Sequence, residues 1–209
     1  MGDAVDTVRA AWTDHVTTHE ALLDRLLVRH RERQRRYHTI EHVAAVVDHV
    51  TELARVEAPH DLGAVVAAAL YHDAVYEPTS PANERASARL ARRDLTSLGW
   101  DPSRVERVAE MIEGTATHLD PADVDTAVLY DADLAILAAS APAYDAYVVA
   151  VRSEYRHVDD DAWTSGRTAV LQGFVERPTL YATDSGRERW EAGARANLAR
   201  ELAALEAGS

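Results

Sequence analysis

The segment LGAVVAAALYHD, residues 62–73, decides the fold of this chain. It is apolar or small up to Tyr71 and then ends on His72 and Asp73. A helix with so little polar surface belongs inside the protein, where a histidine and an aspartate are costly unless they pair or bind a cation. The alternative is a helix-ending hydrogen bond between His72 and Asp73 in which neither residue binds a ligand.

The remainder of the sequence also favours helices. Apolar residues recur every three or four positions, alanine is abundant, and the chain has 1 phenylalanine, so strand signals are poor. Acidic residues before proline, at Asp101-Pro102 and Asp120-Pro121, predict helix starts. The spacing predicts an all-α protein with helices over residues 3–33, 38–56, 61–73, 82–98, 102–115, 122–139, 142–156, 160–176 and 186–206.

Composition narrows the function. The chain has 209 residues, no cysteine and a formal net charge of -13. Thiolate metal sites and cysteine nucleophiles are excluded, so a metal must be held by nitrogen and oxygen. The negative charge disfavours a nucleic acid polymer but leaves room for a small anionic substrate beside a metal. No membrane-length apolar run or signal core is present, so we expect a cytoplasmic protein without a membrane partner.

Two further clusters carry polar residues that fit a site. In YHTIEH, residues 37–42, His38 and His42 are four apart and share one helix face, although a surface or capping pair has the same spacing. In YDADLAI, residues 130–136, Asp131 and Asp133 lie about 200° apart on a helix. One should therefore face inward and one outward, and we favour Asp133 as the inward residue, although periodicity does not settle the choice.

The order of these motifs, H, then HD, then D in an apolar helix, resembles the HD superfamily of metal-dependent phosphohydrolases. The wider pattern, YHxxxH, HDAVY, NExxSA and DADLAIL, is similar to a bacterial subfamily of predicted HD phosphohydrolases, and it extends from about Tyr37 to Leu202. The resemblance implies a single HD-type helical bundle over residues 1–209. The site would lie within residues 38–133, with the helices of residues 142–206 packed on the core.

The resemblance also implies a ligand set. His42, His72 and Asp73 match the first metal ligands of the family, and Asp133 matches its ADxL ligand. Imidazole nitrogen and carboxylate oxygen suit a divalent Mn, Fe, Co, Ni, Zn or Mg ion, among which the sequence does not choose. Such a site would activate water for attack on a phosphate ester, and Asp73 is then also part of the catalytic machinery.

Catalytic partners are implied in the same way. His38 matches the histidine that donates a proton to the leaving oxygen in related cyclic-nucleotide phosphodiesterases, although Thr39 replaces the asparagine of their YHNxxH motif. Glu84 resembles a glutamate that orients the nucleophilic water. The alternative for Glu84 is a first-turn acid that the helix dipole stabilises.

Two residues are candidates for substrate binding. His118 follows a helix end and is expected to contact phosphate or a second metal, unless it is an ordinary loop histidine. Arg36 ends a basic run over residues 29–36 that would steer a phosphate toward the site, unless it is a solvated helix face. The other histidines are expected at the surface; they are His15, His19, His30, His49, His60 and His157.

The leading hypothesis is a hydrolase of a small phosphomonoester or phosphodiester that uses metal-activated water, with a nucleotide as one candidate substrate. A second hypothesis is an HD-type di-iron oxygenase, but His118 is the one histidine between Asp73 and Asp133, which leaves a second iron short of ligands. A third is a non-catalytic module that binds metal or nucleotide. The sequence leaves open whether the chain forms a homo-oligomer.

Overall fold

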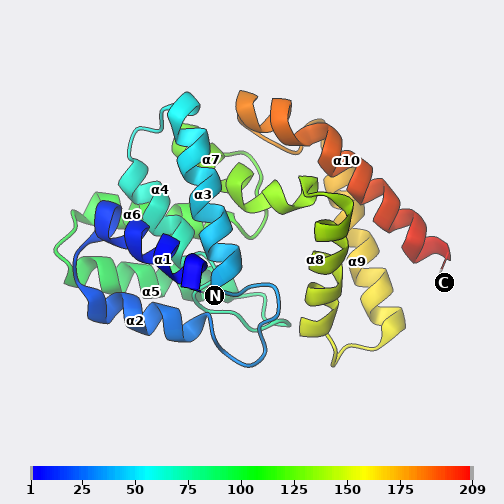
Figure 1. Cartoon of the computed structure of the whole chain (residues 1–209), viewed down its shortest axis with the longest axis horizontal. Coiled ribbons are helices and arrows are strands. Elements are labelled where there is room, and N and C mark those ends of the chain that lie inside the picture. Colours follow the sequence, from blue (N-terminus) through cyan, green and yellow to red (C-terminus); the bar gives the residue numbers. More distant parts are fainter. Residues whose placement is uncertain (1, 208–209) are drawn as a thin grey trace.

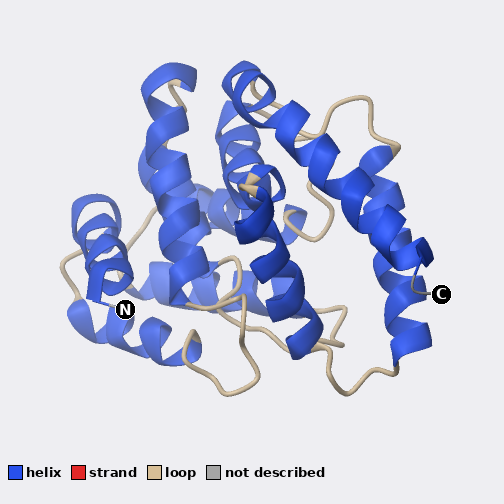
Figure 2. Cartoon of the chain, turned by 45° about the vertical axis from the view of Figure 1, so that its right-hand side comes forward, coloured by secondary structure: helices blue, strands red, loops and turns tan. Residues whose placement is uncertain are grey.

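The computed structural model describes residues 2–207, and its regular structure in that range is entirely helical (Figures 1 and 2). The all-α prediction is therefore confirmed. The helices are α1 (Gly2–Ala11), α2 (Glu20–Arg29), α3 (Ile40–Glu57), α4 (Leu62–Tyr71), α5 (Asn83–Ser97), α6 (Pro102–Gly114), α7 (Val124–Leu134), α8 (Ala141–Glu154), α9 (Asp160–Val175) and α10 (Asp184–Ala207), with a π-helical turn η1 (Trp12–Val16) and a 3-10 turn η2 (Ala135–Ala138).

The predicted helix over residues 3–33 is wrong, because the chain breaks between α1 and α2. Thr17 has an extended backbone, with φ -174° and ψ 163°, directly after η1. One straight helix of that length would extend about 46 Å and could not wrap around a small core. The break lets Trp12, the first residue of η1, and the leucines of α2 pack into the same core.

Aspartate side chains define several helix starts. Asp101 accepts hydrogen bonds from the amides of Ser103 and Arg104, with Pro102 in the first turn, so this predicted start is confirmed. The start predicted at residues 120–121 is wrong. Asp120 has a left-handed backbone, with φ 47°, and the cap is Asp123, which has an extended backbone.

Helix α4 lies at the centre of the larger hydrophobic core. Every residue from Ala64 to Tyr71 is buried, and α4 contacts η1, α3, α5, α6 and α7. Its alanines permit close approach on all sides, and each buried valine or leucine contributes roughly 1.5–3 kcal/mol. Because α4 is packed on all sides along its length, polar groups collect at its C-terminal end, next to His72.

A second hydrophobic cluster is built from η2 and helices α8–α10, which lie to one side of α1–α7 in Figure 1. It contains Leu137, Tyr144, Leu171 and Leu198, all of them buried. Trp190 of α10 packs against both clusters. The assignment of residues 1–209 to one domain stays a prediction.

No single helix within residues 2–207 is long and apolar enough to cross a membrane. The bent pair of Val124–Ala138 and Ala141–Glu154, whose parts meet at 104°, passes the same test by length and composition. The first part of that pair is α7 with η2, and most of α7 is buried in the core.

Asp131 joins the two clusters. Its carboxylate accepts hydrogen bonds from the amides of Ala182 and Thr183, at 2.7 and 2.8 Å, and from the Thr183 hydroxyl at 2.6 Å. It is 1% exposed, so the expectation that one of the two α7 aspartates faces outward is wrong. A Cβ on Gly186 would lie 2.3 Å from Asp131 Oδ2, so α10 approaches this carboxylate too closely for a side chain there.

Replacing Asp131 with alanine is expected to lower the free energy of unfolding by about 2–3 kcal/mol, because buried donors on the loop before α10 lose a charged acceptor. The matched control is Asp145→Ala, which removes an exposed ion pair with Arg200 and should cost less than about 1 kcal/mol. Urea unfolding of both variants measures the difference, and equal losses would contradict this account of Asp131.

Candidate metal centre

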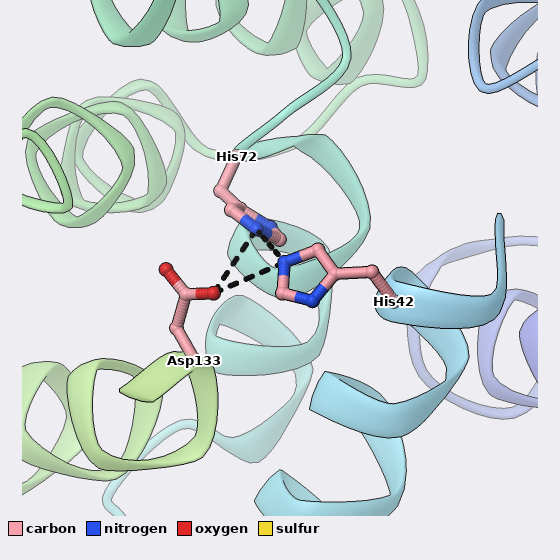
Figure 3. Close-up of side chains that lie close together, drawn as sticks. All are labelled: His42, His72 and Asp133. Atoms are coloured by element: carbon pink, nitrogen blue, oxygen red, sulfur yellow. Dashed lines mark hydrogen bonds and ion pairs between the residues drawn. The ribbon is translucent and has the colours of Figure 1, made fainter. Parts of the chain in front are cut away.

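Three helices deliver four side chains to one point at the end of α4. His42 comes from the first turn of α3, His72 and Asp73 follow the last residue of α4, and Asp133 lies near the end of α7. Figure 3 shows the ring nitrogens of His42 and His72 and one carboxylate oxygen of Asp133 turned toward each other. Residues that lie up to 91 positions apart in the sequence thus share one site.

The distances within this cluster are short. The Nε2 atoms of His42 and His72 lie 3.1 Å apart, and Asp133 Oδ1 is 3.1 Å from the first and 3.5 Å from the second. Asp73 Oδ2 is 3.1 Å from His72 Nε2 and 3.5 Å from His42 Nε2. The structure therefore brings together all four predicted ligands, and it separates Asp131 from them.

Neighbouring groups fix the orientation of these side chains. His72 Nδ1 is 2.8 Å from the Ala69 carbonyl oxygen, to which it donates, so its Nε2 is left free to accept or to bind a cation. Asp133 Oδ2 lies 2.8 Å from His118 Nε2. His118 thus orients Asp133 and also lines the adjoining cavity; its predicted contact with substrate stays a prediction.

Charge is concentrated in this buried place. The carboxylates of Asp73 and Asp133 are 15% and 13% exposed, and the imidazoles are almost fully buried. Burial alone would lower the pKa of His72, but the two carboxylates raise it well above its ordinary value. Burial would likewise raise the pKa of Asp133, but His72 and His118 lower it well below its ordinary value. The cluster as a whole therefore stabilises a positive charge placed among its nitrogen and oxygen ligand atoms.

The donor set fits a divalent metal ion. Ligand atoms about 2.1 Å from a metal in tetrahedral or octahedral geometry lie about 3.0–3.4 Å from each other, close to the separations in this cluster. Two nitrogens and two carboxylate oxygens suit a borderline or hard divalent ion. A candidate metal site of His42, His72 and Asp133, with Asp73 beside them, is therefore present.

Arg35 holds the segment that carries Asp73. Its guanidinium is buried and donates to the carbonyl oxygens of His38 and Asp73, at 2.9 and 2.8 Å, and to that of Ala74. Arg36, the predicted substrate ligand, is exposed and donates to the carbonyl oxygens of its own loop at Arg33 and Arg35. It does not line the cavity described below, and its predicted contact with substrate stays a prediction.

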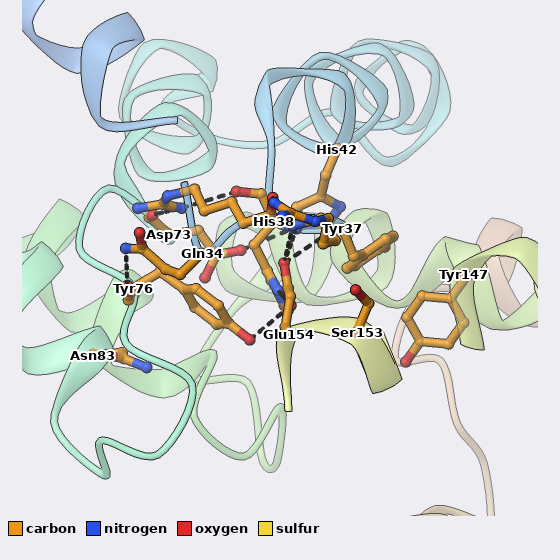
Figure 4. A network of polar contacts seen from close by, with 12 residues as sticks. Gln34, Tyr37, His38, His42, Asp73, Tyr76, Asn83, Tyr147, Ser153 and Glu154 are labelled. Carbon is orange, nitrogen blue, oxygen red and sulfur yellow. Dashed lines mark hydrogen bonds and ion pairs between the residues drawn. The ribbon is translucent and has the colours of Figure 1, made fainter. Parts of the chain in front are cut away.

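Glu154, the last residue of α8, is the functional neighbour that the sequence analysis missed. Its buried carboxylate lies 2.7 Å from His38 Nδ1 and accepts hydrogen bonds from the amides of Arg36, Tyr37 and His38. The Tyr76 hydroxyl also donates to it, at 2.8 Å (Figure 4). Burial alone would raise the pKa of Glu154, but these hydrogen bonds, above all that of His38, lower it to about 2.

The signal for Glu154 in the sequence is faint. It stands in VRSEYRH, residues 151–157, without a motif around it, and resembles the many acidic residues on helix surfaces. Its spacing of three from Val151, which is buried, is the one indication that it faces inward. His38 was predicted as a site residue, whereas its partner Glu154 lies 116 residues away in the sequence.

The segment after the HD pair is held by the start of α5. Asn83 forms two hydrogen bonds with the backbone of Glu77, and the Ser87 hydroxyl bonds the backbone of Val75. Glu84 stands between these two anchors and lines the cavity beside the cluster. Its predicted contact with water stays a prediction, and the first-turn position that favours an acid is also observed.

The cavity next to the cluster has a volume of about 590 Å³. Its lining includes His38, Asp73, Glu84 and Asp133, together with residues of α8 and α9. The expectation that His30 lies at the surface is wrong. His30 is 2% exposed, and neither of its ring nitrogens has a hydrogen-bond partner among the described residues. Burial lowers the pKa of His30 to about 3, so this ring is neutral.

We expect the purified protein to hold about one equivalent of divalent metal, and His72→Ala to lose it, because that variant removes a ligand from the centre of the cluster. His60→Ala is the control, since the side chain of His60 is 78% exposed and is not one of the proposed ligands. Elemental analysis measures the metal. Chelation should also lower the stability of the wild-type protein by about 2.7 kcal/mol if free metal was held at 100 times its Kd. Metal retained in His72→Ala would contradict the assignment.

Comparison with known proteins agrees with this geometry. Residues 39–140 match the HD domain family, and the match contains His42, His72, Asp73 and Asp133 but ends before Glu154. No curated protein and no solved structure matches the chain. An HD domain suggests a metal-dependent phosphohydrolase. The predicted resemblance is confirmed: this chain contains an HD domain over residues 39–140.

Proposed function

We propose that this protein is a metal-dependent hydrolase of a small phosphomonoester or phosphodiester. One observation carries the proposal: the His/His/Asp/Asp cluster lines a cavity that His38, paired with a buried Glu154, also lines. A metal site alone is compatible with a structural clasp. A metal site that shares a cavity with a held imidazole is an arrangement suited to proton transfer.

His42, His72, Asp73 and Asp133 would hold the metal, with Asp133 kept in place by His118 and Asp73 by Arg35 through its backbone. A bound divalent ion would polarise a phosphoryl oxygen and lower the pKa of bound water toward about 7. The protein contributes a fixed set of ligands whose orientation does not change during the reaction.

His38 is the proposed general acid. Its Nδ1 is engaged by Glu154, and no hydrogen bond occupies its Nε2 among the described residues, so Nε2 is free to give a proton to the leaving oxygen. The Glu154 carboxylate holds the ring through Nδ1, and the Tyr76 ring stacks on His38 at a centroid distance of 4.1 Å. Glu154 is therefore a positioning residue, and it acts through His38.

Glu84 is the proposed group that orients the attacking water. It lines the same cavity as the cluster, and the side chains on either side of it in α5, Asn83 and Ser87, hold the backbone of the preceding loop. These contacts hold the start of α5 beside the cluster, from where the Glu84 carboxylate would accept a hydrogen bond from water.

Replacing Asp73 with alanine should reduce phosphate release to the level of the metal-free protein, because the variant removes a ligand carboxylate. His38→Ala should lower kcat by about 10²–10⁴-fold while metal content is unchanged. Phosphate release from a mixed panel of phosphoesters with Mn, Mg, Co, Ni or Zn measures both. Full activity in Asp73→Ala would overturn the proposed function, and bound iron with oxygen consumption would point to an oxygenase.

Glu154→Gln should lower kcat by about 10-fold or more and change KM by less than about 3-fold, because the amide keeps the shape but removes the negative charge beside His38. The double variant with His38→Ala should be no slower than His38→Ala alone, since Glu154 acts through that ring. Additive losses would instead indicate a structural contribution of Glu154 to the 30–38 loop.

A further inference from the structure

One wall of the cavity beside the metal cluster is mainly apolar and aromatic. Helices α8 and α9 and the segment between them supply this wall, which includes Tyr147, Val151, Tyr155, Trp163 and Phe174. All of these residues lie beyond the stretch that matches the HD domain family. This wall is continuous with the cluster, because both line the same cavity. A substrate whose phosphoryl group reaches the cluster would place the rest of its structure against it.

No residue that lines the wall carries an unpaired positive charge; Arg177, whose guanidinium lies 4.5 Å from the Phe174 ring centroid, does not line the cavity and donates to the carbonyl oxygens of Thr117 and His118. Arg167 is the one arginine among the residues that line the cavity, and its guanidinium makes a two-point contact with the Glu201 carboxylate, at 2.7 and 3.0 Å. Both groups are buried, at 8% and 6% exposure, so their charges compensate each other. A second phosphate against this wall would lose part of its hydration to apolar side chains without an unpaired cation among the lining residues to compensate, which is unfavourable.

One position in α9 keeps this space open. Gly166 lines the cavity in the interior of the helix, and a Cβ built on it would meet nothing within 4 Å. Glycine destabilises a helix interior relative to alanine, so the residue does nothing for α9 itself. Val170, one turn later, also lines the cavity and is 52% exposed, which is a large apolar surface for a bound group to cover.

We propose that the α8–α9 wall is the subsite for an uncharged, flat, ring-bearing leaving group of a phosphate monoester, and that Gly166 leaves the room it occupies. This inference rests on the proposed function, because it assumes that the phosphoryl group lies at the metal cluster. The ring is held by dispersion and stacking against Trp163 and Tyr155, whose own ring centroids are 5.4 Å apart. A nucleoside monophosphate and an aryl phosphate share this chemistry.

The first test compares substrates in the metal-loaded wild-type protein. A nucleoside 5′-monophosphate and 4-nitrophenyl phosphate represent the two sources of a ring, ribose 5-phosphate and glycerol phosphate lack one, and a nucleoside triphosphate adds charge. We expect kcat/KM for at least one ring monophosphate to exceed that of the ring-free esters by about 10-fold or more, and to exceed that of the triphosphate by about 100-fold. Preference for the ring-free esters or the triphosphate would overturn the inference.

The second test fills the space. Gly166→Leu should raise KM for the preferred ring substrate by about 10-fold and leave KM for ribose 5-phosphate within about 3-fold. Gly173→Leu is the matched control, since Gly173 lies in the same helix with open space above it but does not line the cavity. Leucine favours a helix more than glycine does, so both variants should fold. Equal behaviour of the two variants would contradict a subsite at Gly166.

The third test adds a cation. Val170→Arg should shift preference toward the triphosphate, measured as the ratio of the two kcat/KM values, because it supplies the positive charge that the wall lacks. Calorimetry of the binding of a non-hydrolysable ring-bearing phosphonate tests the ring subsite separately from the hydrolase activity. Binding that Gly166→Leu abolishes, without turnover of any ester, would refute the hydrolase and retain the subsite. Turnover that Gly166→Leu leaves unchanged would refute the subsite alone.

Discussion

Two imidazoles and two carboxylates meet at the C-terminal end of α4, and the rest of the structure is arranged so that they can. Helix α4 is buried along its length, which places His72 and Asp73 inside the protein. Charges in such a place are unfavourable unless they compensate each other or share a cation. His42 from α3 and Asp133 from α7 complete that compensation, at 3.1 Å from each other.

Around this cluster, backbone contacts restrict movement. Arg35 ties the loop before α3 to the HD segment, and Glu154 ties the same loop to α8. The C-terminal helices therefore contribute to the site itself and do not only cover it. Asp131 makes the corresponding contact on the opposite side of α7, where it holds the loop before α10. Two aspartates of one helix thus have separate roles. Asp133 belongs to the site, and Asp131 holds the two hydrophobic clusters together.

The sequence predicted what depends on local pattern. The apolar run of α4 and the helical spacing of the rest of the chain predicted an all-helical fold. The candidate ligand set was implied by the resemblance to the HD superfamily, because periodicity did not settle the choice between Asp131 and Asp133. Helices from α3 onward agree with the predicted ranges to within a few residues. The break at Thr17 was missed because it is enforced by packing around the core and not by a glycine or proline.

Long-range pairing could not be predicted in the same way. Glu154 and Asp131 look like surface acids in the sequence, and only the folded chain supplies the amide and hydroxyl donors that make their burial favourable. Arg36 and Arg35 are neighbours in a basic run, and nothing local distinguishes the exposed one from the buried one. The direction of a side chain in an irregular loop depends on tertiary contacts, which single-sequence patterns do not contain.

The most direct test of the account is anomalous X-ray diffraction from crystals grown with Mn²⁺. The account predicts one strong anomalous peak between the Nε2 atoms of His42 and His72 and the carboxylates of Asp73 and Asp133, at about 2.0–2.2 Å from each ligand atom. A peak at another place, or full occupancy of the protein with Mn²⁺ in solution and no peak at this cluster, would contradict it.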